Sequence, residues 1–401
     1  MMIRLSRTLV VAPALAALAT SATAQQRLLD PRVANTGVVV EQWSFANPTA
    51  GGGSSAVVGA SQFTVPVTAI VPITSSWAVD AYAAFAHGSV TIDRGAIGRE
   101  ELTLSGVSDA KLRIVGKLRG DNVILTLGAS LPSGTTGLDQ SQLEALSVLA
   151  APALRFRTPT LGSGPGGTGG IVFAGQSGPW ALAFASSFEF RGSYAPSQAI
   201  AAGVGEPALR TGNAVHVSFG ADRITGQARQ TISMIGDYFT DGELKDPAIG
   251  QTTPLTFRLG PALTATYQVQ ASTGNVESMF YALERIRSNY SVGDSTVAGS
   301  WRNESELGLM NSFTISPRAA IRFGIDSRFH TAPAAAAQTV QSFSTAGILA
   351  GGATLGLRFG TTSGGFVVEP FVRGQAGQLD FGGPVRRATG FSGGLTFTGR
   401  F

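Results

Sequence analysis

The stretch RAAIRFGIDSRFH, residues 318–330, decides the class of fold. Its residues sort into two alternating faces: one holds Ala319, Ile321, Phe323, Ile325, Ser327 and Phe329, and the other holds Arg318, Ala320, Arg322, Gly324, Asp326, Arg328 and His330. A helix would scatter these side chains around its axis, whereas a strand points every second side chain the same way. The stretch therefore predicts a long strand with one apolar face and one charged face.

The same alternation recurs in residues 110–119, 180–191, 256–270 and 301–315. These segments are roughly twice as long as the strands of soluble proteins, which typically have about 5–6 residues. Trp and Phe lie near several segment ends, where a transmembrane barrel has its interfacial aromatic girdles. A soluble sandwich would also alternate, but the segment lengths and the aromatic residues favour an all-β, closed antiparallel transmembrane β-barrel.

The number of strands follows from the alternating segments. They are residues 36–46, 59–71, 77–90, 108–119, 122–131, 153–160, 168–176, 180–192, 212–223, 226–239, 256–270, 275–289, 300–315, 318–330, 345–359, 365–376 and 390–401. This is an odd number, whereas bacterial single-chain barrels have an even one, so at least one segment is no strand. The weakest are 36–46, whose alternation is interrupted at Glu41, and 153–160. We expect about 14–16 strands.

Residues 131–170 interrupt the strand pattern. Asp139 can cap a helix N-terminus, with Gln142 at the reciprocal capping-box position. Leucines then recur on one side, and Pro152 ends the pattern. A short helix is therefore predicted here.

Turn lengths set the orientation of the barrel. The short turns are 316–317, 273–275 and 360–364, and the longer ones are 240–255, 290–299, 331–344 and 377–389. Outer-membrane barrels have short periplasmic turns and longer outer loops. A last strand that ends in the periplasm puts the short set there, but the two halves of the chain agree only if one doubtful strand is dropped.

The composition suits strands that face lipid. Hydrophobic residues make up 43% of the chain and charged residues 13%, and the mean hydropathy is +0.18. No stretch is apolar over the roughly 20 residues that a spanning helix needs. A barrel resolves this combination, because only every second residue of its strands meets lipid. Cysteine is absent, and a closed barrel satisfies its backbone without disulfides.

The N-terminus predicts export. Arg4 and Arg7 precede an apolar run, residues 9–18, and Ala22-Thr23-Ala24 forms a small-x-small cleavage pattern. We expect a signal peptide over residues 1–24, a short periplasmic N-terminal segment over 25–35, and the barrel over 36–401. A segment as short as 25–35 argues against a substantial internal plug. The predicted location is the bacterial outer membrane.

The C-terminus ends in an aromatic residue with apolar residues at alternate positions. Phe391, Leu395, Phe397 and Phe401 lie on one face, with glycines at 393 and 399. This resembles the C-terminal assembly signal of bacterial outer-membrane barrels. The resemblance implies recognition by the barrel assembly machinery, and we expect outer-membrane lipids and lipopolysaccharide as the surrounding partners.

Catalytic and cofactor chemistry find little support. The histidines are His87, His216 and His330, and neither HExxH nor CxxC is present. His216 and Ser218 share a face of one strand, which leaves a barrel lipase or protease built on His216 or His330 as an alternative. The glycine-rich runs 51–53 and 162–170 lack the GK[ST] of a phosphate loop. We expect no catalytic residue, no metal, no cofactor and no nucleic-acid partner.

The inward faces carry the candidate functional residues. They are Lys111, Arg113, Lys117, Arg119, Glu189, Arg191, Arg258, Arg302, Glu304, Glu306, Arg322, Asp326, Arg328, Glu369 and Arg373. Opposing rows of arginines and acids can line a wet pore, or they can pair to seal a structural or adhesive barrel. The four basic residues between 111 and 119 share one face. If they line a pore, they favour anionic solutes such as carboxylates.

Two short stretches resemble a known barrel family. Residues 106–113, GVSDAKLR, and residues 131–135, LPSGT, are similar to a strand start and a strand end of barrels associated with uptake of aromatic and other hydrophobic compounds. That family includes the transporters encoded beside phenol meta-cleavage pathways, relatives of the FadL fatty-acid channel. The resemblance implies an outer-membrane channel for small molecules.

Overall fold

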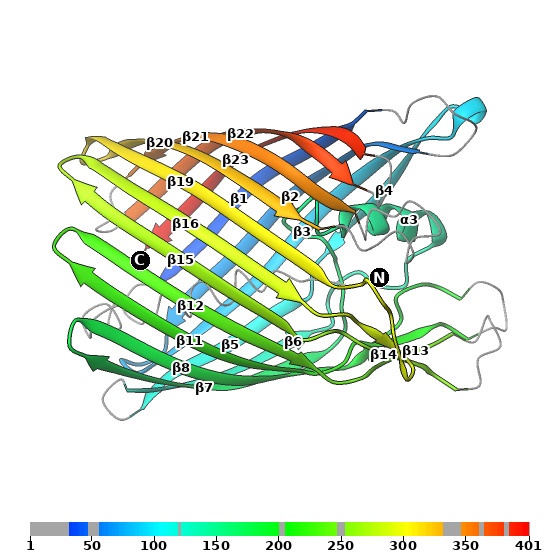
Figure 1. Cartoon of the computed structure of the whole chain (residues 1–401), viewed down its shortest axis with the longest axis horizontal. Coiled ribbons are helices and arrows are strands. Elements are labelled where there is room, and N and C mark those ends of the chain that lie inside the picture. The colour runs from blue at the N-terminus through cyan, green and yellow to red at the C-terminus, as the bar shows by residue number, and fades with distance from the viewer. Residues whose placement is uncertain are drawn as a thin grey trace.

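The computed structural model describes residues 32–46, 56–118, 122–199, 205–246, 253–331, 346–360, 365–380 and 385–400. These residues form a closed antiparallel barrel of 16 strands (Figure 1). The fold class and the strand number are as predicted. The signal peptide, the segment 25–31, Arg119 and Phe401 lie outside the described residues.

Apart from the divided strand formed by β4 and β5, each strand pairs with the next one, and the last pairs with the first. The wall consists of β1 (Val33–Phe45), β2 (Ala56–Pro72), β3 (Trp77–Asp93), β4 (Arg99–Val107), β5 (Ala110–Leu118), β6 (Val123–Leu131), β7 (Gly166–Ser177), β8 (Trp180–Arg191), β11 (Ala214–Thr225), β12 (Ala228–Phe239), β15 (Ala262–Thr273), β16 (Val276–Arg287), β19 (Arg302–Ser316), β20 (Ala319–His330), β21 (Gly347–Phe359), β22 (Gly365–Asp380) and β23 (Val385–Arg400). The barrel closes where Val33 lies opposite Arg400 and Phe45 opposite Ala388. Strands β4 and β5 both pair with β3, so they form one position of the wall, interrupted at Ser108 and Asp109.

The predicted strands need correction at three places: residues 256–270 are interrupted at Gly260 and Pro261, and two further changes concern residues 99–107 and 153–160. Residues 153–160 are not a strand, and residues 99–107, which were not among the predicted segments, are one. Dropping 153–160 also resolves the orientation, because the turns 73–76, 178–179, 226–227, 274–275 and 317–318 then share the end where Val33 and Arg400 lie. That end carries the short turns expected in the periplasm.

The outer surface of the wall is apolar. On β20, Phe323, Ile325 and Phe329 are 44%, 48% and 44% exposed, whereas Arg328 and His330 on the other face are buried. Exposed Leu, Ile, Val and Phe continue this belt around the other strands. Such a surface is stable only against lipid, so these strands span a membrane. Among the described residues, no helix is long and apolar enough to cross one.

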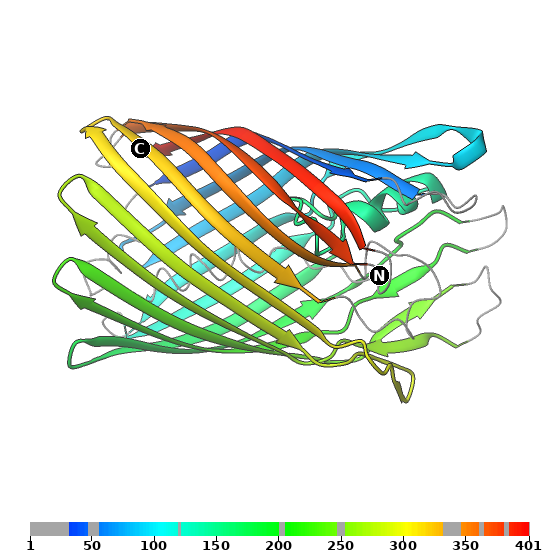
Figure 2. The ribbon, with the colours of Figure 1, turned by 45° about the horizontal axis from the view of Figure 1, so that its top comes forward.

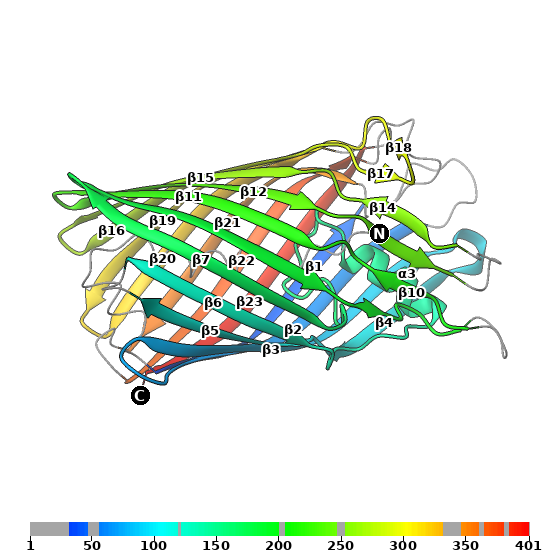
Figure 3. The ribbon, with the colours of Figure 1, turned by 90° about the horizontal axis from the view of Figure 1, so that it is seen from below.

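A second, smaller sheet continues half of the wall beyond the barrel. Its strands are β9 (Ser193–Tyr194), β10 (Ala208–Arg210), β13 (Gly242–Lys245), β14 (Leu255–Arg258), β17 (Ser291–Val292) and β18 (Ser295–Thr296), in the order β18-β17-β14-β13-β10-β9. Figure 3 shows it at the end opposite the C-terminus. On the other half, the β3–β4 hairpin, with a short 3-10 helix, η1 (Gly95–Ile97), projects beyond the rim (Figure 2).

Strands β6 and β7 are joined by a long connection. Residues 132–165, which we call the lumen segment, contain the helix α3 (Gln140–Leu149). The predicted capping box is present: the Asp139 side chain accepts a hydrogen bond from the Gln142 backbone, and the Gln142 side chain accepts one from Asp139 N. The expectation that the short N-terminal segment forms no substantial plug stays a prediction, because residues 25–31 lie outside the described residues. The lumen segment, which is an internal connection, contacts the inner face of the wall instead.

Candidate functional site in the barrel lumen

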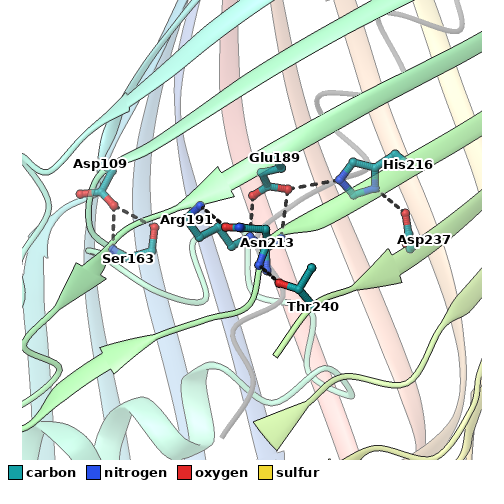
Figure 4. A network of polar contacts seen from close by, with 8 residues as sticks. All are labelled: Asp109, Ser163, Glu189, Arg191, Asn213, His216, Asp237 and Thr240. Carbon is teal, nitrogen blue, oxygen red and sulfur yellow. Dashed lines mark hydrogen bonds and ion pairs between the residues drawn. The ribbon is translucent and has the colours of Figure 1, made fainter. Parts of the chain in front are cut away.

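One side chain ties both ends of the lumen segment to the wall. The Asp109 carboxylate, at the break between β4 and β5, accepts hydrogen bonds from Gly134 N at 2.9 Å and Ser163 N at 2.6 Å. It also accepts one from Ser163 Oγ at 2.8 Å (Figure 4). Asp109 is 3% exposed. These charge-assisted bonds fix where the chain leaves and re-enters the wall.

Helix α3 lies against the inner side of the projecting hairpin. Its buried residues Ala145, Val148 and Leu149 belong to a cluster that also contains Leu102 and Leu104 of β4. At the hairpin turn, Arg94 pairs with Glu100 at 2.8 Å and with Glu144 of the helix at 2.9 Å. Hydrogen bonds to these two carboxylates raise the pKa of the Arg94 guanidinium.

The hydrogen bonds that cap α3 also change the pKa of the capping residue, Asp139. The hydrogen bond from Gln142 N lowers the pKa of the Asp139 carboxyl below its ordinary value, and the Ser141 hydroxyl adds to this effect.

After α3 the chain runs along the inner face of β1 and β2. The Trp43 indole donates to Leu154 O at 3.2 Å, and the Gln62 amide makes hydrogen bonds of 2.7 and 2.9 Å with the carbonyl and amide of Thr158. The Glu41 carboxylate accepts from Arg157 N at 2.9 Å. The alternation that suggested a strand over 153–160 is therefore real, but its partners are side chains rather than a neighbouring strand.

The wall behind this segment is apolar on both of its faces. On β1, Val38 and Val40 face outward and are 39% and 43% exposed, whereas Val39 and Trp43 face inward and are 1% exposed. Inward-facing apolar residues of β2–β4 and β21–β23 join the same cluster. A lumen face without a plug would be polar. Apolar residues on both faces of one strand are the sequence signal that could have located the docking surface.

The opposite side of the lumen segment carries charge. Arg155 forms an ion pair with Glu306 of β19, whose other oxygen accepts from the Tyr281 hydroxyl at 2.9 Å. Gly308 makes room for this tyrosine, because a Cβ there would overlap its ring. The segment thus reaches from the β1–β2 wall to the facing wall.

Further arginines gather beside this contact. Arg373 pairs with Asp326 at 2.6 Å, Arg328 lies over the Trp43 ring at 5.3 Å, and Arg157 lies over the Phe371 ring at 5.8 Å. We call Arg155, Arg157, Arg328 and Arg373 the arginine cluster. Arg155 and Arg157 lie on the exposed side of the lumen segment, whereas Arg328 is 6% exposed.

A second polar network lies on β8, β11 and β12. His216 places Nδ1 2.7 Å from Asp237 and Nε2 3.3 Å from Glu189, and Glu189 pairs with Arg191 at 2.9 Å (Figure 4). Both imidazole nitrogens therefore face carboxylates rather than Ser218. Arg191 and Arg287 lie over the Phe239 ring at 5.9 and 5.0 Å.

The structure distributes the predicted residues around the inner wall. Arg113 donates to Asp80 at 2.6 Å and shares the inward face of β5 with Lys111 and Lys117. Arg322 and Glu369 pair at 2.9 Å, and Glu304 lies 3.6 Å from His330. Arg302 begins β19 opposite Arg287.

One of the predicted residues lies elsewhere. Arg258 is not in the barrel wall. Gly260 and Pro261 interrupt the predicted strand 256–270, and Arg258 pairs with Asp241 in the outer sheet at 3.3 Å.

Sequence reasoning missed the residues of the lumen segment and their contacts. Glu41, Trp43, Arg155, Arg157 and Tyr281 were not predicted as site residues, because their roles depend on a segment that pairs with no strand. Phe391 and Phe397 are on the lipid-facing side of β23, and Phe397 stacks on Phe366 at 5.6 Å. Their part in assembly stays a prediction. Among the described residues, no group of three acidic or histidine side chains could hold a metal ion.

An even number of antiparallel strands closed into a barrel, with an apolar outer band and short turns at one end, is the architecture of the bacterial outer membrane. The chain is therefore an outer-membrane β-barrel. No family model matches it, and no curated protein is similar to it in sequence.

Similar solved structures come from the same architectural class. The CymD monoaromatic hydrocarbon channel is 9% identical, with a TM-score of 0.43 over 96% of this chain and 93% of that one. Pseudomonas putida OprB is 11% identical, with a TM-score of 0.43 over 93% and 94%. A Pseudomonas aeruginosa FadL homologue is 11% identical, with a TM-score of 0.42 over 93% and 91%. Identities and scores this low assign neither a family nor a substrate.

Proposed function

We propose that the chain is a passive outer-membrane channel for small molecules. The observation that carries this proposal is the accessibility of charges enclosed by the wall. The side chains of Arg155, Glu189 and Arg373 are 39%, 30% and 29% exposed, although all three lie inside the barrel. A sealed lumen would bury such groups or fill the space with apolar side chains. A wall of 16 strands is wide enough to leave an aqueous path.

The lumen segment gives this path its narrowest part and its chemistry. A passing solute meets the arginine cluster together with the carboxylates that pair with it, Glu306 and Asp326. Charged groups along the path favour water-soluble solutes, including carboxylates and the ionised forms of aromatic acids, over uncharged hydrocarbons. The basic wall formed by Lys111, Arg113 and Lys117 would add to an anion preference, although Asp80 offsets part of its charge.

Planar-bilayer conductance of the purified chain tests the proposal. We expect stable unit currents, with liposome swelling fastest for small sugars and aromatic acids and slowest for fatty acids. Absence of conductance and swelling in folded protein would favour a sealed structural or adhesive barrel.

Ion selectivity is measured separately, as the reversal potential in a salt gradient. Anion preference should fall in the double variant Arg113→Glu, Lys117→Glu, and more so at low salt, where screening is weaker. An unchanged reversal potential would assign this wall a structural role.

The enzymatic alternative has its own test. His216 directs both of its ring nitrogens toward carboxylates, Asp237 at 2.7 Å and Glu189 at 3.3 Å, and neither nitrogen toward Ser218. We expect no hydrolysis of lipid or peptide substrates by the purified chain. Hydrolysis by the native chain that is lost in His216→Ala or His330→Ala would contradict the channel proposal and favour an enzyme.

A further inference from the structure

The arginine cluster contains a cation whose hydrogen bonds are incomplete. Arg328 is 6% exposed, and its Nε and Nη2 atoms are buried without a hydrogen-bond partner among the described residues. Buried guanidinium N–H groups normally donate hydrogen bonds, because a buried donor without an acceptor has lost its hydration and gained nothing in return. The Trp43 ring at 5.3 Å covers one face of the guanidinium plane and takes no N–H donor from its edge.

The charged groups around Arg328 balance one another, so the charge of Arg328 itself is in excess. The charges acting on it include Arg155 and Arg373 on one hand and Glu306 and Asp326 on the other. Glu41 lies nearby and is influenced by Arg157, Arg328 and Arg373. Within the described part of the chain, this set amounts to four arginines and three carboxylates. One positive charge remains in excess, which matches a monoanion.

The native ion pairs leave room for that anion. Glu306 engages Arg155 and Asp326 engages Arg373, yet the side chains of both arginines remain accessible from the lumen, at 39% and 29% exposed. The Arg373 Nε atom is also buried without a hydrogen-bond partner in the described residues. Arginines from two strands and from the lumen segment therefore lie close enough to act on one another electrostatically.

The backbone of the lumen segment supports the same conclusion. Arg155 adopts φ 54°, the left-handed conformation that is unfavourable for a residue with a side chain. Strain of this kind persists where the surrounding structure requires it, and it concentrates at functional sites. Here it turns Arg155 away from the apolar wall and toward Glu306.

We propose that Arg155, Arg328 and Arg373 bind the carboxylate group of an organic monoanion inside the lumen. The planar guanidinium fork matches the geometry of a carboxylate and accepts it through two parallel hydrogen bonds. Arg328 supplies the unused donors, and the two exposed arginines receive the solute from the lumen. The inference rests on the proposed channel function for its purpose, since it names the class of solute that the channel selects.

Calorimetric titration of the purified full-length chain in detergent micelles tests the site. Sodium benzoate is the probe, and benzamide, which has nearly the same shape without the charge, is the control ligand. We expect benzoate to bind and benzamide not to bind. Arg328→Gln should weaken benzoate binding by about ten- to a hundredfold, as expected for loss of charge-assisted hydrogen bonds. Arg328→Lys, which keeps the charge but loses the fork, should weaken it as well.

Control variants separate the site from the general field and from misfolding. Arg210→Gln removes one charge from the outer sheet, where Arg210 and Glu243 are both exposed, and should leave benzoate binding unchanged. Arg155→Gln removes the ion pair with Glu306 but leaves the hydrogen bonds between the wall strands in place, and it should weaken binding in the same direction. This second variant decides the matter if Arg328→Gln does not fold.

Several results would overturn the site. They are absence of benzoate binding, equal binding of benzamide, tighter binding of inorganic phosphate, and full affinity in Arg155→Gln and Arg328→Gln. Conductance tests the proposed channel function independently of benzoate binding. A chain that binds benzoate without conducting would contradict the channel and leave the site, whereas a chain that conducts without binding benzoate would contradict the site alone.

Discussion

Strand β20 and residues 153–161 of the lumen segment share one sequence pattern and have opposite surroundings. Each alternates arginines with large apolar residues. In β20 the apolar Phe323 is 44% exposed to the outside and Arg328 is buried inside. In the lumen segment Phe156 is 4% exposed, while Arg155 is accessible. Alternation therefore reports that a segment has two different faces, but it does not report whether lipid or protein covers the apolar one.

The two regions also differ in how their backbones are satisfied. Strand β20 has a complete set of partners in β19 and β21. The lumen segment relies on side chains, because Gln62 and Glu41 bond its backbone groups and Trp43 caps a carbonyl. A strand in the wall is thus fixed by its neighbours along its whole length, whereas the lumen segment is held at a few points. Each point can be removed separately.

Removing the lumen segment should have the largest effect. Deleting residues 137–160 joins Thr136 to Leu161, and the nearby Gly162 N already donates to Thr135 O at 3.0 Å. We expect the barrel to fold and its unit conductance to rise several-fold, because nothing would then cross the lumen beside Glu306. Planar-bilayer recording measures the change. Deletion of residues 95–97 at the exposed hairpin tip is the control and should leave conductance unaltered.

Replacing Phe323 or Phe156 by arginine should show whether lipid or protein covers each phenylalanine. Phe323→Arg exposes a guanidinium to lipid, which costs about 2–4 kcal/mol near the bilayer midplane, and should reduce the fraction of chain that folds into vesicles. Phe156→Arg should leave insertion intact and raise conductance instead. Guanidinium unfolding in lipid vesicles measures the first effect and bilayer recording the second. Equal insertion defects in both variants would contradict the assignment of Phe156 to the lumen.

Loss of the Asp109 hydrogen bonds to Gly134 and Ser163 should loosen the lumen segment without opening the wall. Each charge-assisted hydrogen bond contributes about 1.5–3 kcal/mol, so Asp109→Ala should make the segment sensitive to protease and the single-channel current noisy. The barrel itself should resist protease as before. Limited proteolysis in vesicles checks this, and a lumen segment that stays protected would show that the Asp109 hydrogen bonds are dispensable.

A nearby phenol reports on the same carboxylate. Burial, and secondarily the charge of Asp109, raise the pKa of Tyr194 to about 12. In Asp109→Asn the pKa should fall, because the negative charge that opposes the phenolate is gone, but it should stay above the ordinary value since burial remains. Ultraviolet titration against a Tyr194→Phe control measures the shift. A pKa that does not move would show that the Asp109 side chain does not contribute to the raised pKa of Tyr194.

The helix cap should give the smallest effect. The pKa of Asp139 is lowered in the folded chain, so its contribution to α3 is present above the ordinary carboxyl pKa of 3.8 and is lost as the pH falls through the lowered value. Asp139→Ala should therefore destabilise α3 slightly at neutral pH and remove this acid dependence. Protease sensitivity of residues 140–149 against pH checks the prediction.

Most of the wall was predictable from the sequence, and most of the site was not. The lipid-facing side of β20 follows from alternation alone, because a strand has a period of two and lipid excludes charge. The inward position of Arg328 and Asp326 follows from the same argument. Their neighbours do not, since Arg373 lies 47 residues away from Asp326 in the sequence. Only the register of β20, β21 and β22 brings these two side chains together.

The sequence by itself determined a closed membrane barrel, the helix cap at Asp139 and the sorting of charges to the inner face, because these depend on local periodicity and on the cost of placing charge in lipid. The tertiary structure alone decided where residues 132–165 go. Their apolar side can be covered by any apolar surface, and only the assembled barrel offers one, on the inner face of β1–β4 and β21–β23. That docking places Arg155 opposite Glu306 and beside Arg328, which no local pattern specifies.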